Sequence, residues 1–66
     1  MKYFRAQMKT KETFDFDKKC QYVTTDNLYG CVVFKESCTS DALAIIPTKN
    51  IYIIESVEEP DPVNAQ

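Results

Sequence analysis

The stretch from Gly30 to Val57 contains three apolar runs, each about the length of a β-strand and each bounded by polar or turn-forming residues. The runs are Gly-Cys-Val-Val-Phe, Ala-Leu-Ala-Ile-Ile-Pro and Ile-Tyr-Ile-Ile. Successive side chains of a strand point to opposite faces of its sheet, so each run places apolar side chains on both faces. A small antiparallel sheet with one solvated face does not require this pattern. One face therefore has a core to fill, and the other needs a partner or remains exposed.

The length and composition limit the class of protein. The chain has 66 residues, which is enough for one domain. A domain of this size buries only about 60% of the surface that it exposes when unfolded, so an oligomer interface is a reasonable source of further stability. Hydrophobic residues make up 44% of the sequence, including four Tyr and four Phe, so we expect a packed core.

Charge and hydropathy indicate where such a protein acts. The net charge of −2 gives no general attraction to phosphate backbones. No apolar run approaches the roughly 18–20 residues of a membrane span, so we expect no membrane partner. The first residues, Met-Lys-Tyr-Phe-Arg-Ala-Gln, lack the apolar core of a signal peptide. These features predict a cytoplasmic location.

Alternation of apolar and polar residues predicts further strands before Gly30. Residues 3–9 alternate, residues 13–17 alternate again with Phe14 and Phe16 opposite two aspartates, and residues 20–25 are rich in β-favouring side chains. Residues 25–27 are predicted to end the third strand in a turn. In the first of these runs Phe4, Ala6 and Met8 share one face, whereas Tyr3, Arg5, Gln7 and Lys9 share the other.

Together these segments predict an all-β fold. Short strands at close spacing are typical of an antiparallel meander, here of five to six strands, that closes into a small barrel. We assign this barrel to residues 1–57. Residues 58–66 are acidic and contain Pro60 and Pro62, which predicts a disordered, flexible acidic tail.

The segment Ala-Ile-Ile-Pro-Thr-Lys-Asn-Ile at residues 44–51 is similar to the end of an SH3 domain, where an apolar strand meets a proline, a short 3₁₀ turn and a final strand. This resemblance implies an SH3-like barrel topology. It does not carry the SH3 function, because the groove that grips proline-rich ligands in that family typically includes a tryptophan, and this chain has none. The compact composition also resembles that of small accessory proteins encoded by phages and prophages.

The residues that usual catalytic sites need are missing. The chain has no His to activate a nucleophile, and its one Gly cannot make a phosphate-binding loop. Asp15 and Asp17 share a strand face, but they alternate with phenylalanines and fit a solvated outer face. We therefore predict that the protein is not an enzyme.

Three cysteines are too many for one disulfide and too few for two. Cys20, Cys31 and Cys38 are separated by ten and six residues, unlike the paired Cys-x-x-Cys of a zinc site. A metal would need a carboxylate such as Asp41 or a second subunit. We expect no metal or other cofactor, with two small buried thiols and one thiol in a loop.

The two-faced runs lead to the hypothesis of self-association. A closed barrel takes one set of side chains inside, and an apolar set left outside forms a patch typical of protein interfaces. The simplest assembly is a symmetric dimer. The candidates for this contact are Val32, Phe34, Leu43, Ile45, Tyr52 and Ile54.

Two classes of function remain. The first is a non-catalytic protein-interaction module, acting as a homo-oligomer that regulates or inhibits an unidentified host protein, as a phage-borne factor would. The alternative is a nucleic-acid-binding barrel of the Sm or SH3-like type, which the acidic residues near the first hairpin disfavour. The basic and aromatic residues of that alternative site are Lys2, Tyr3, Arg5, Lys9 and Lys11.

Overall fold

The computed structural model describes residues 1–60, and within them the chain forms strands, turns and two short 3₁₀ elements. The predicted all-β class is confirmed, and six predicted strands are found with changed ends. In chain order the elements are β1 (Lys2–Met8), β2 (Thr13–Phe14), η1 (Phe16–Lys18), β3 (Tyr22–Asp26), β4 (Cys31–Lys35), β5 (Ala42–Pro47), η2 (Thr48–Asn50) and β6 (Ile51–Glu58).

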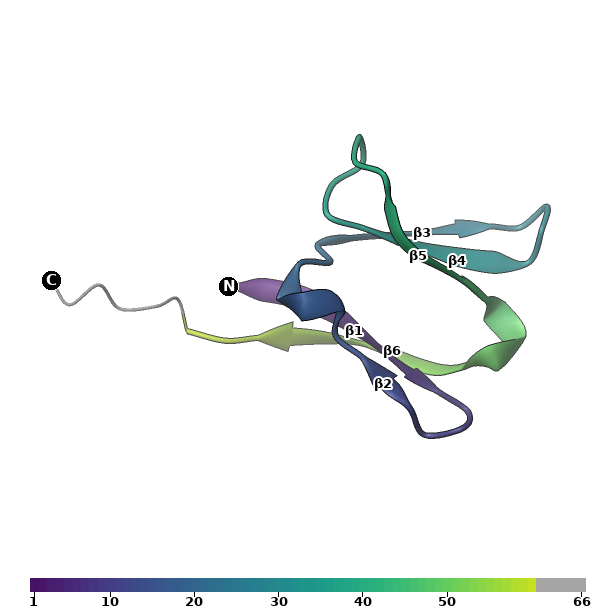
Figure 1. Cartoon of the computed structure of the whole chain (residues 1–66), viewed down its shortest axis with the longest axis horizontal. Helices are drawn as coiled ribbons and strands as arrows, with labels where there is room; N and C mark the ends of the chain where they lie inside the picture. The colour runs from purple at the N-terminus through teal and green to yellow at the C-terminus, as the bar shows by residue number, and fades with distance from the viewer. Residues whose placement is uncertain (61–66) are drawn as a thin grey trace, which may run out of the picture.

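The strands form two three-stranded antiparallel sheets, in the orders β2-β1-β6 and β3-β4-β5 (Figure 1). The second sheet is a simple meander, whereas β6 returns across the molecule to pair with β1. That ladder runs from Lys2 opposite Glu58 to Met8 opposite Ile51. The strands β1 and β4 are therefore central, and β5 and β6 are each paired along one side within the described residues.

The core lies between the two sheets. Its fully covered members are Ala6, Cys20, Val32 and Phe34, with exposed fractions of 0–3%. The ring of Phe34 stacks on Phe16, with 4.8 Å between the ring centroids. Burying one such aromatic side chain contributes about 1.5–3 kcal/mol, so this pair is a main source of stability. Partly buried residues around the cluster are Phe4, Phe16, Val23, Ala44, Ile46, Ile51 and Ile54.

The predicted orientation of β4 is wrong. Val32 and Phe34 were expected on the outer face, but they are 3% and 0% exposed and face the first sheet. Cys31 and Val33 take the half-buried opposite face. The physical reason is that β4 is apolar on both faces, so alternation alone cannot decide which set fills the core.

A bulge in β6 overturns the expected outward position of Ile54. Gln7 pairs with Ile53, but Met8 pairs with Ile51, so Tyr52 is an extra residue in the ladder. An extra residue shifts the alternation of side chains by one. Ile51 and Ile54 consequently both pack against the core although they are three residues apart.

The predicted second strand ends early. β2 stops at Phe14, and Phe16, Asp17 and Lys18 have positive φ angles of 55°, 55° and 62°. Residues other than glycine adopt this left-handed conformation at a cost of roughly 1–2 kcal/mol each. The turn is held by the Asp15 carboxylate, which accepts a bond of 3.1 Å from the Asp17 amide. It also places the Phe16 ring against the core.

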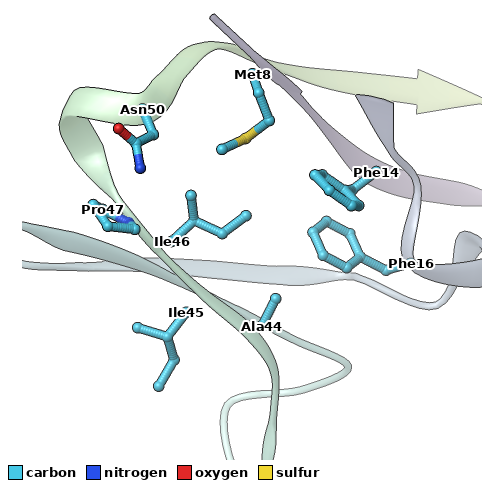
Figure 2. Close-up of a pocket in the computed structure, with 8 residues that line it drawn as sticks. All are labelled: Met8, Phe14, Phe16, Ala44, Ile45, Ile46, Pro47 and Asn50. Atoms are coloured by element: carbon cyan, nitrogen blue, oxygen red, sulfur yellow. The ribbon is translucent and has the colours of Figure 1, made fainter. Parts of the chain in front are cut away.

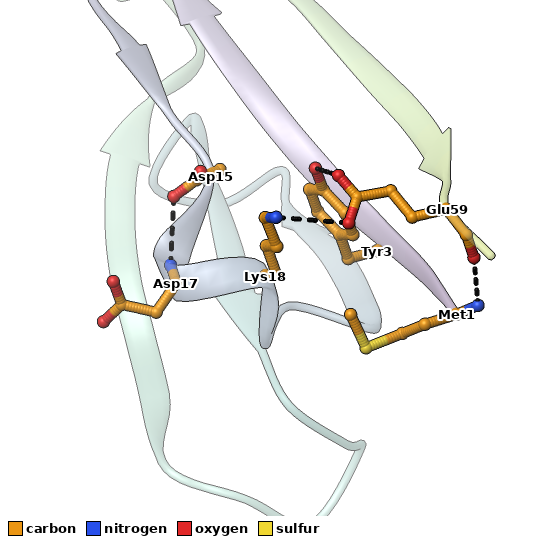
Figure 3. A network of polar contacts seen from close by, with 6 residues as sticks. All are labelled: Met1, Tyr3, Asp15, Asp17, Lys18 and Glu59. Carbon is orange, nitrogen blue, oxygen red and sulfur yellow. Dashed lines mark hydrogen bonds and ion pairs between the residues drawn. The ribbon is translucent and has the colours of Figure 1, made fainter. Parts of the chain in front are cut away.

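The strand β6 continues one residue past the predicted domain boundary, to Glu58, and Glu59 is bonded to the N-terminal residues. The division into domain and tail itself stays a prediction. The Glu59 amide donates to the Met1 carbonyl at 2.8 Å. Its carboxylate accepts bonds of 3.2 Å from the Tyr3 hydroxyl and from the Lys18 ammonium (Figure 3). The remainder of the predicted tail, residues 61–66, lies outside the described residues.

Candidate protein-binding surfaces

An apolar pocket opens between β5 and two phenylalanines, Phe14 of β2 and Phe16 of η1 (Figure 2). Its volume is about 270 Å³. Ile46 and Met8 point into this space toward the stacked rings of Phe14 and Phe16, whereas Ile45 points away from it on the other side of β5. The lining residues are Met8, Phe14, Phe16, Ala44, Ile45, Ile46, Pro47 and Asn50.

The chemistry of this pocket suits an apolar side chain. Asn50 is the single hydrogen-bonding side chain in its lining, and no charged residue contributes. Sites for small molecules usually combine apolar walls with several convergent polar groups that fix the ligand. This pocket lacks such a set, so its lining suits the burial of apolar surface.

The outer face of the second sheet carries exposed apolar side chains. Leu43 and Ile45 on β5 are 36% and 62% exposed, and Ile45 lies directly opposite the half-buried Val33 of β4. Leu43 and Ile45 thus lie outside the core, as the self-association hypothesis requires. Tyr52 is 69% exposed, but it belongs to the other sheet. The part of these residues in self-association stays a prediction.

The turn between β3 and β4 displays two large apolar side chains. Leu28 is 82% exposed and Tyr29 is 77% exposed. Their backbone is fixed, because the Asp26 carboxylate accepts hydrogen bonds from both amides at 3.0 and 3.3 Å. Gly30 closes the turn with a φ of 65°, a conformation that glycine adopts without strain. The pair stands on a preorganised turn.

Sequence reasoning missed Leu28 and Tyr29. It placed a turn at residues 25–27, but it assigned no role to the two apolar residues that follow. The available signal was their position between Asp26-Asn27 and Gly30, where hairpin turns usually carry small or polar residues. Large apolar side chains at the tip of a hairpin cannot reach the core.

The residues of the predicted nucleic-acid patch do not form one exposed surface in the structure. Tyr3 was expected on an exposed face but is 3% exposed, because Lys18 and Glu59 lie over it. Arg5 forms an ion pair with Glu55 at 3.1 Å, which offsets its charge. Lys2 remains exposed at the start of β1, and Lys9 and Lys11 are exposed at the β1–β2 turn.

A different aromatic residue takes the place of Tyr3. A second cavity of about 270 Å³ is lined by Gln7, Met8, Lys9, Lys11 and Tyr52. Tyr52 is the extra residue of the β6 bulge, and its exposed side chain lines this cavity together with the two lysines. Neither the bulge nor this shared cavity is visible in the sequence.

The pKa shifts found among the described residues come mainly from burial and from contacts with Glu59. Burial, the nearby Glu59 charge and the hydrogen bond to Glu59 raise the pKa of Tyr3. The same carboxylate raises the pKa of Lys18 through a hydrogen bond and charge attraction. Burial also raises the pKa of the Cys20 thiol, which makes it a poor nucleophile.

The thiols lie as the sequence predicted in two cases of three. Cys20 is buried in the core and Cys38 is exposed in the β4–β5 loop, whereas Cys31 is only partly covered. Residues 1–60 contain no cluster of three His, Cys, Asp or Glu side chains arranged to hold a metal ion. Within the same range no helix has the length and apolar character needed to cross a bilayer.

Comparisons of this chain with models of protein families, with curated proteins and with solved structures found no match.

Proposed function

We propose that this protein is a non-catalytic protein-interaction module that acts in the cytoplasm as a homo-oligomer. It regulates or inhibits a host protein, in the manner of small accessory proteins of phages and prophages. The observation that carries the proposal is the β3–β4 turn, which holds Leu28 and Tyr29 in the solvent at a fixed geometry.

We further assign the two sheets to an SH3-like barrel. Two features support this assignment. The 3₁₀ turn η2 lies between β5 and β6, where the resemblance of residues 44–51 to an SH3 domain implies one. The last described strand, β6, returns to pair with the first strand, as a barrel built from a meander requires.

The turn has the properties of a binding anchor. Burying a leucine or an aromatic side chain contributes about 1.5–3 kcal/mol, and this contribution is unused while Leu28 and Tyr29 are exposed. Tyrosine is also enriched among the few residues that dominate binding energy at interfaces. Because Asp26 already fixes the backbone, little conformational entropy remains to be lost on binding.

The test compares three forms of the protein. Each form is immobilised on a solid support and incubated with an extract of the cells in which the protein acts. Wild-type protein and an Ile53→Ser control should retain the same partner, whereas a Leu28→Ser, Tyr29→Ser variant should lose it. Ile53→Ser removes an exposed apolar side chain from the other sheet, so it controls for general loss of apolar surface. Retention of the same proteins by all three forms, or of none by the wild type, would contradict the proposal.

A second candidate function is nucleic-acid binding, which the cavity lined jointly by Tyr52 and the lysines of the first hairpin favours. An exposed ring beside Lys9 and Lys11 offers one stacking surface and two cations. If this site binds single strands, the affinity should fall steeply with salt, and a Lys9→Gln, Lys11→Gln variant should lower the logarithmic slope by about 1.4. Absence of binding to RNA and DNA at low salt would exclude this function.

A further inference from the structure

The outer edge of β5 presents unpaired backbone groups. Within the described residues β5 pairs only with β4, and the Thr48 amide donates to the Gly30 carbonyl at 2.9 Å beyond the end of that ladder. Hydrogen-bonded pairs alternate along an antiparallel ladder. Because Thr48 is bonded to Gly30, every second residue before it, Ile46 and then Ala44, also directs its backbone groups toward β4. The amide and carbonyl of Ile45 therefore point away from the sheet.

This edge is blunted at its two ends but open at its centre. Pro47 has no amide hydrogen to donate, and the register shift between Phe34 and Lys35 makes Leu43 an extra residue. Natural edge strands are usually protected by charged side chains or irregular backbone along their length. Ala42–Pro47 contains no charged residue, and Ile45 at its centre is 62% exposed.

We propose that a second copy of this chain pairs with β5 in antiparallel orientation, about a two-fold axis at Ile45. The pairing joins two β3-β4-β5 sheets into one continuous sheet across the dimer. This pairing rests on the proposed function, because it specifies the contact through which the proposed homo-oligomer forms. Ile45 lies opposite Ile45 of the second copy, and the two residues exchange both of their outward hydrogen bonds.

The charges beside β5 favour a second copy over other occupants. Asp41 precedes β5 and Lys49 follows it, so an antiparallel pairing centred on residue 45 brings the acidic end of each copy near the basic end of the other. Both residues are exposed. Between them the paired segments are neutral, so no like charges face each other across the axis.

The side chains of β5 match in the same register. On the outer face Ile45 lies opposite Ile45 of the second copy. Since Ile45 also pairs with Val33 of its own sheet, the apolar row continues across the dimer. On the inner face Ala44 lies opposite Ile46 of the second copy, so a small side chain accommodates a large one. The two Ile45 side chains thereby cover part of each other's apolar surface without any change in the fold of the chain.

The first test is the mass of the protein in solution, measured by analytical ultracentrifugation at micromolar concentration. Wild-type protein should sediment with twice the 7.6 kDa mass of the chain. Ile45→Lys places two ammonium groups together at the axis and should raise the dissociation constant by about 100-fold or more. Ile53→Lys changes a comparably exposed isoleucine on β6, 44% exposed, and should leave the dimer intact.

The second test reads the register directly. In a Cys31→Ser, Cys38→Ser background, Ile45→Cys should form a covalent dimer on mild oxidation, because opposed residues of this kind have Cα atoms about 5.5 Å apart. Ile53→Cys in the same background should stay monomeric under denaturing conditions. A monomeric wild type, a dimer that survives Ile45→Lys, or equal cross-linking at both positions overturns the inference.

These outcomes are separable from those of the partner-binding test. If the wild type is monomeric yet still retains a protein through Leu28 and Tyr29, the β5 contact is refuted and the interaction function stands. If Ile45 mediates the dimer but the turn retains nothing, the dimer stands and the proposed partner function fails.

Discussion

Replacing Asp17 with glycine should stabilise the protein, because Asp17 lies in the middle of the left-handed turn η1 with a φ of 55°. A side chain in this conformation costs roughly 1–2 kcal/mol, and glycine avoids that cost. Glycine also makes the unfolded chain more flexible, which opposes folding by about 0.4–1 kcal/mol. The Asp17 carboxylate points away from Asp15 (Figure 3), so its removal leaves the turn's hydrogen bond in place.

The two opposing effects leave a net gain of about 0–1.6 kcal/mol, centred near 0.8 kcal/mol, in the free energy of unfolding. For a domain of this size the central value raises Tm by about 3–6 °C. Thermal unfolding followed by far-ultraviolet circular dichroism, at one chain concentration for all variants, measures the change.

The matched control is the same substitution two residues earlier. Asp15 has an ordinary φ of −102°, and its carboxylate accepts the bond from the Asp17 amide at 3.1 Å. Asp15→Gly removes that bond and adds flexibility without relieving strain, so it should lower the stability by about 0.5–1 kcal/mol. Shifts of the same sign for the two variants would refute the assignment of strain to this turn.

Two further predictions concern the core and the Tyr3 contact. Phe34→Ala removes a fully buried ring and should cost about 3–5 kcal/mol, a large part of the roughly 3–10 kcal/mol expected for the whole chain. Leu28 is 82% exposed, so Leu28→Ala should change the free energy of unfolding, measured in urea, by less than about 0.5 kcal/mol. Similar losses for the Phe34→Ala and Leu28→Ala variants would contradict the placement of Phe34 in the core. The raised pKa of Tyr3 means that its neutral phenol is favoured in the folded state, so its stabilising effect is complete below the ordinary value of 10.0 and is lost as the pH rises through the raised value. Tyr3→Phe should therefore reduce the loss of stability as the pH rises above 10.0, and parallel curves for the two proteins would oppose this reasoning.

The strand pattern could be predicted from sequence, because alternation and turn residues are local signals. The inward face of β1 illustrates this: Phe4 and Ala6 pack in the core as their spacing predicts. The faces of β4 and the second half of β6 could not be predicted. Val32 and Val33 have the same chemistry, and no local signal marks Tyr52 as the extra residue of a bulge.

The surfaces were harder to predict because they depend on contacts between distant residues. The alternation of β1 puts Tyr3 among polar neighbours, and it is buried only because Lys18 and Glu59 lie over it from far along the chain. Likewise, Tyr52 lines the same cavity as Lys9 and Lys11 because β6 pairs with β1. The left-handed turn at Phe16–Lys18 lacks a glycine, so the second strand was predicted to continue through residues 16 and 17.

The pairing of β6 with β1 also sets the order in which the protein can fold during synthesis. The strand β1 leaves the ribosome first, but one of its two neighbours, Ile51–Glu58, is made after every other strand. The sheet β3-β4-β5 joins segments that are close in the sequence, so it can form before β6 pairs with β1. Until β6 is available, the apolar side chains of β1 have an incomplete sheet to pack in, which leaves them exposed to aggregation.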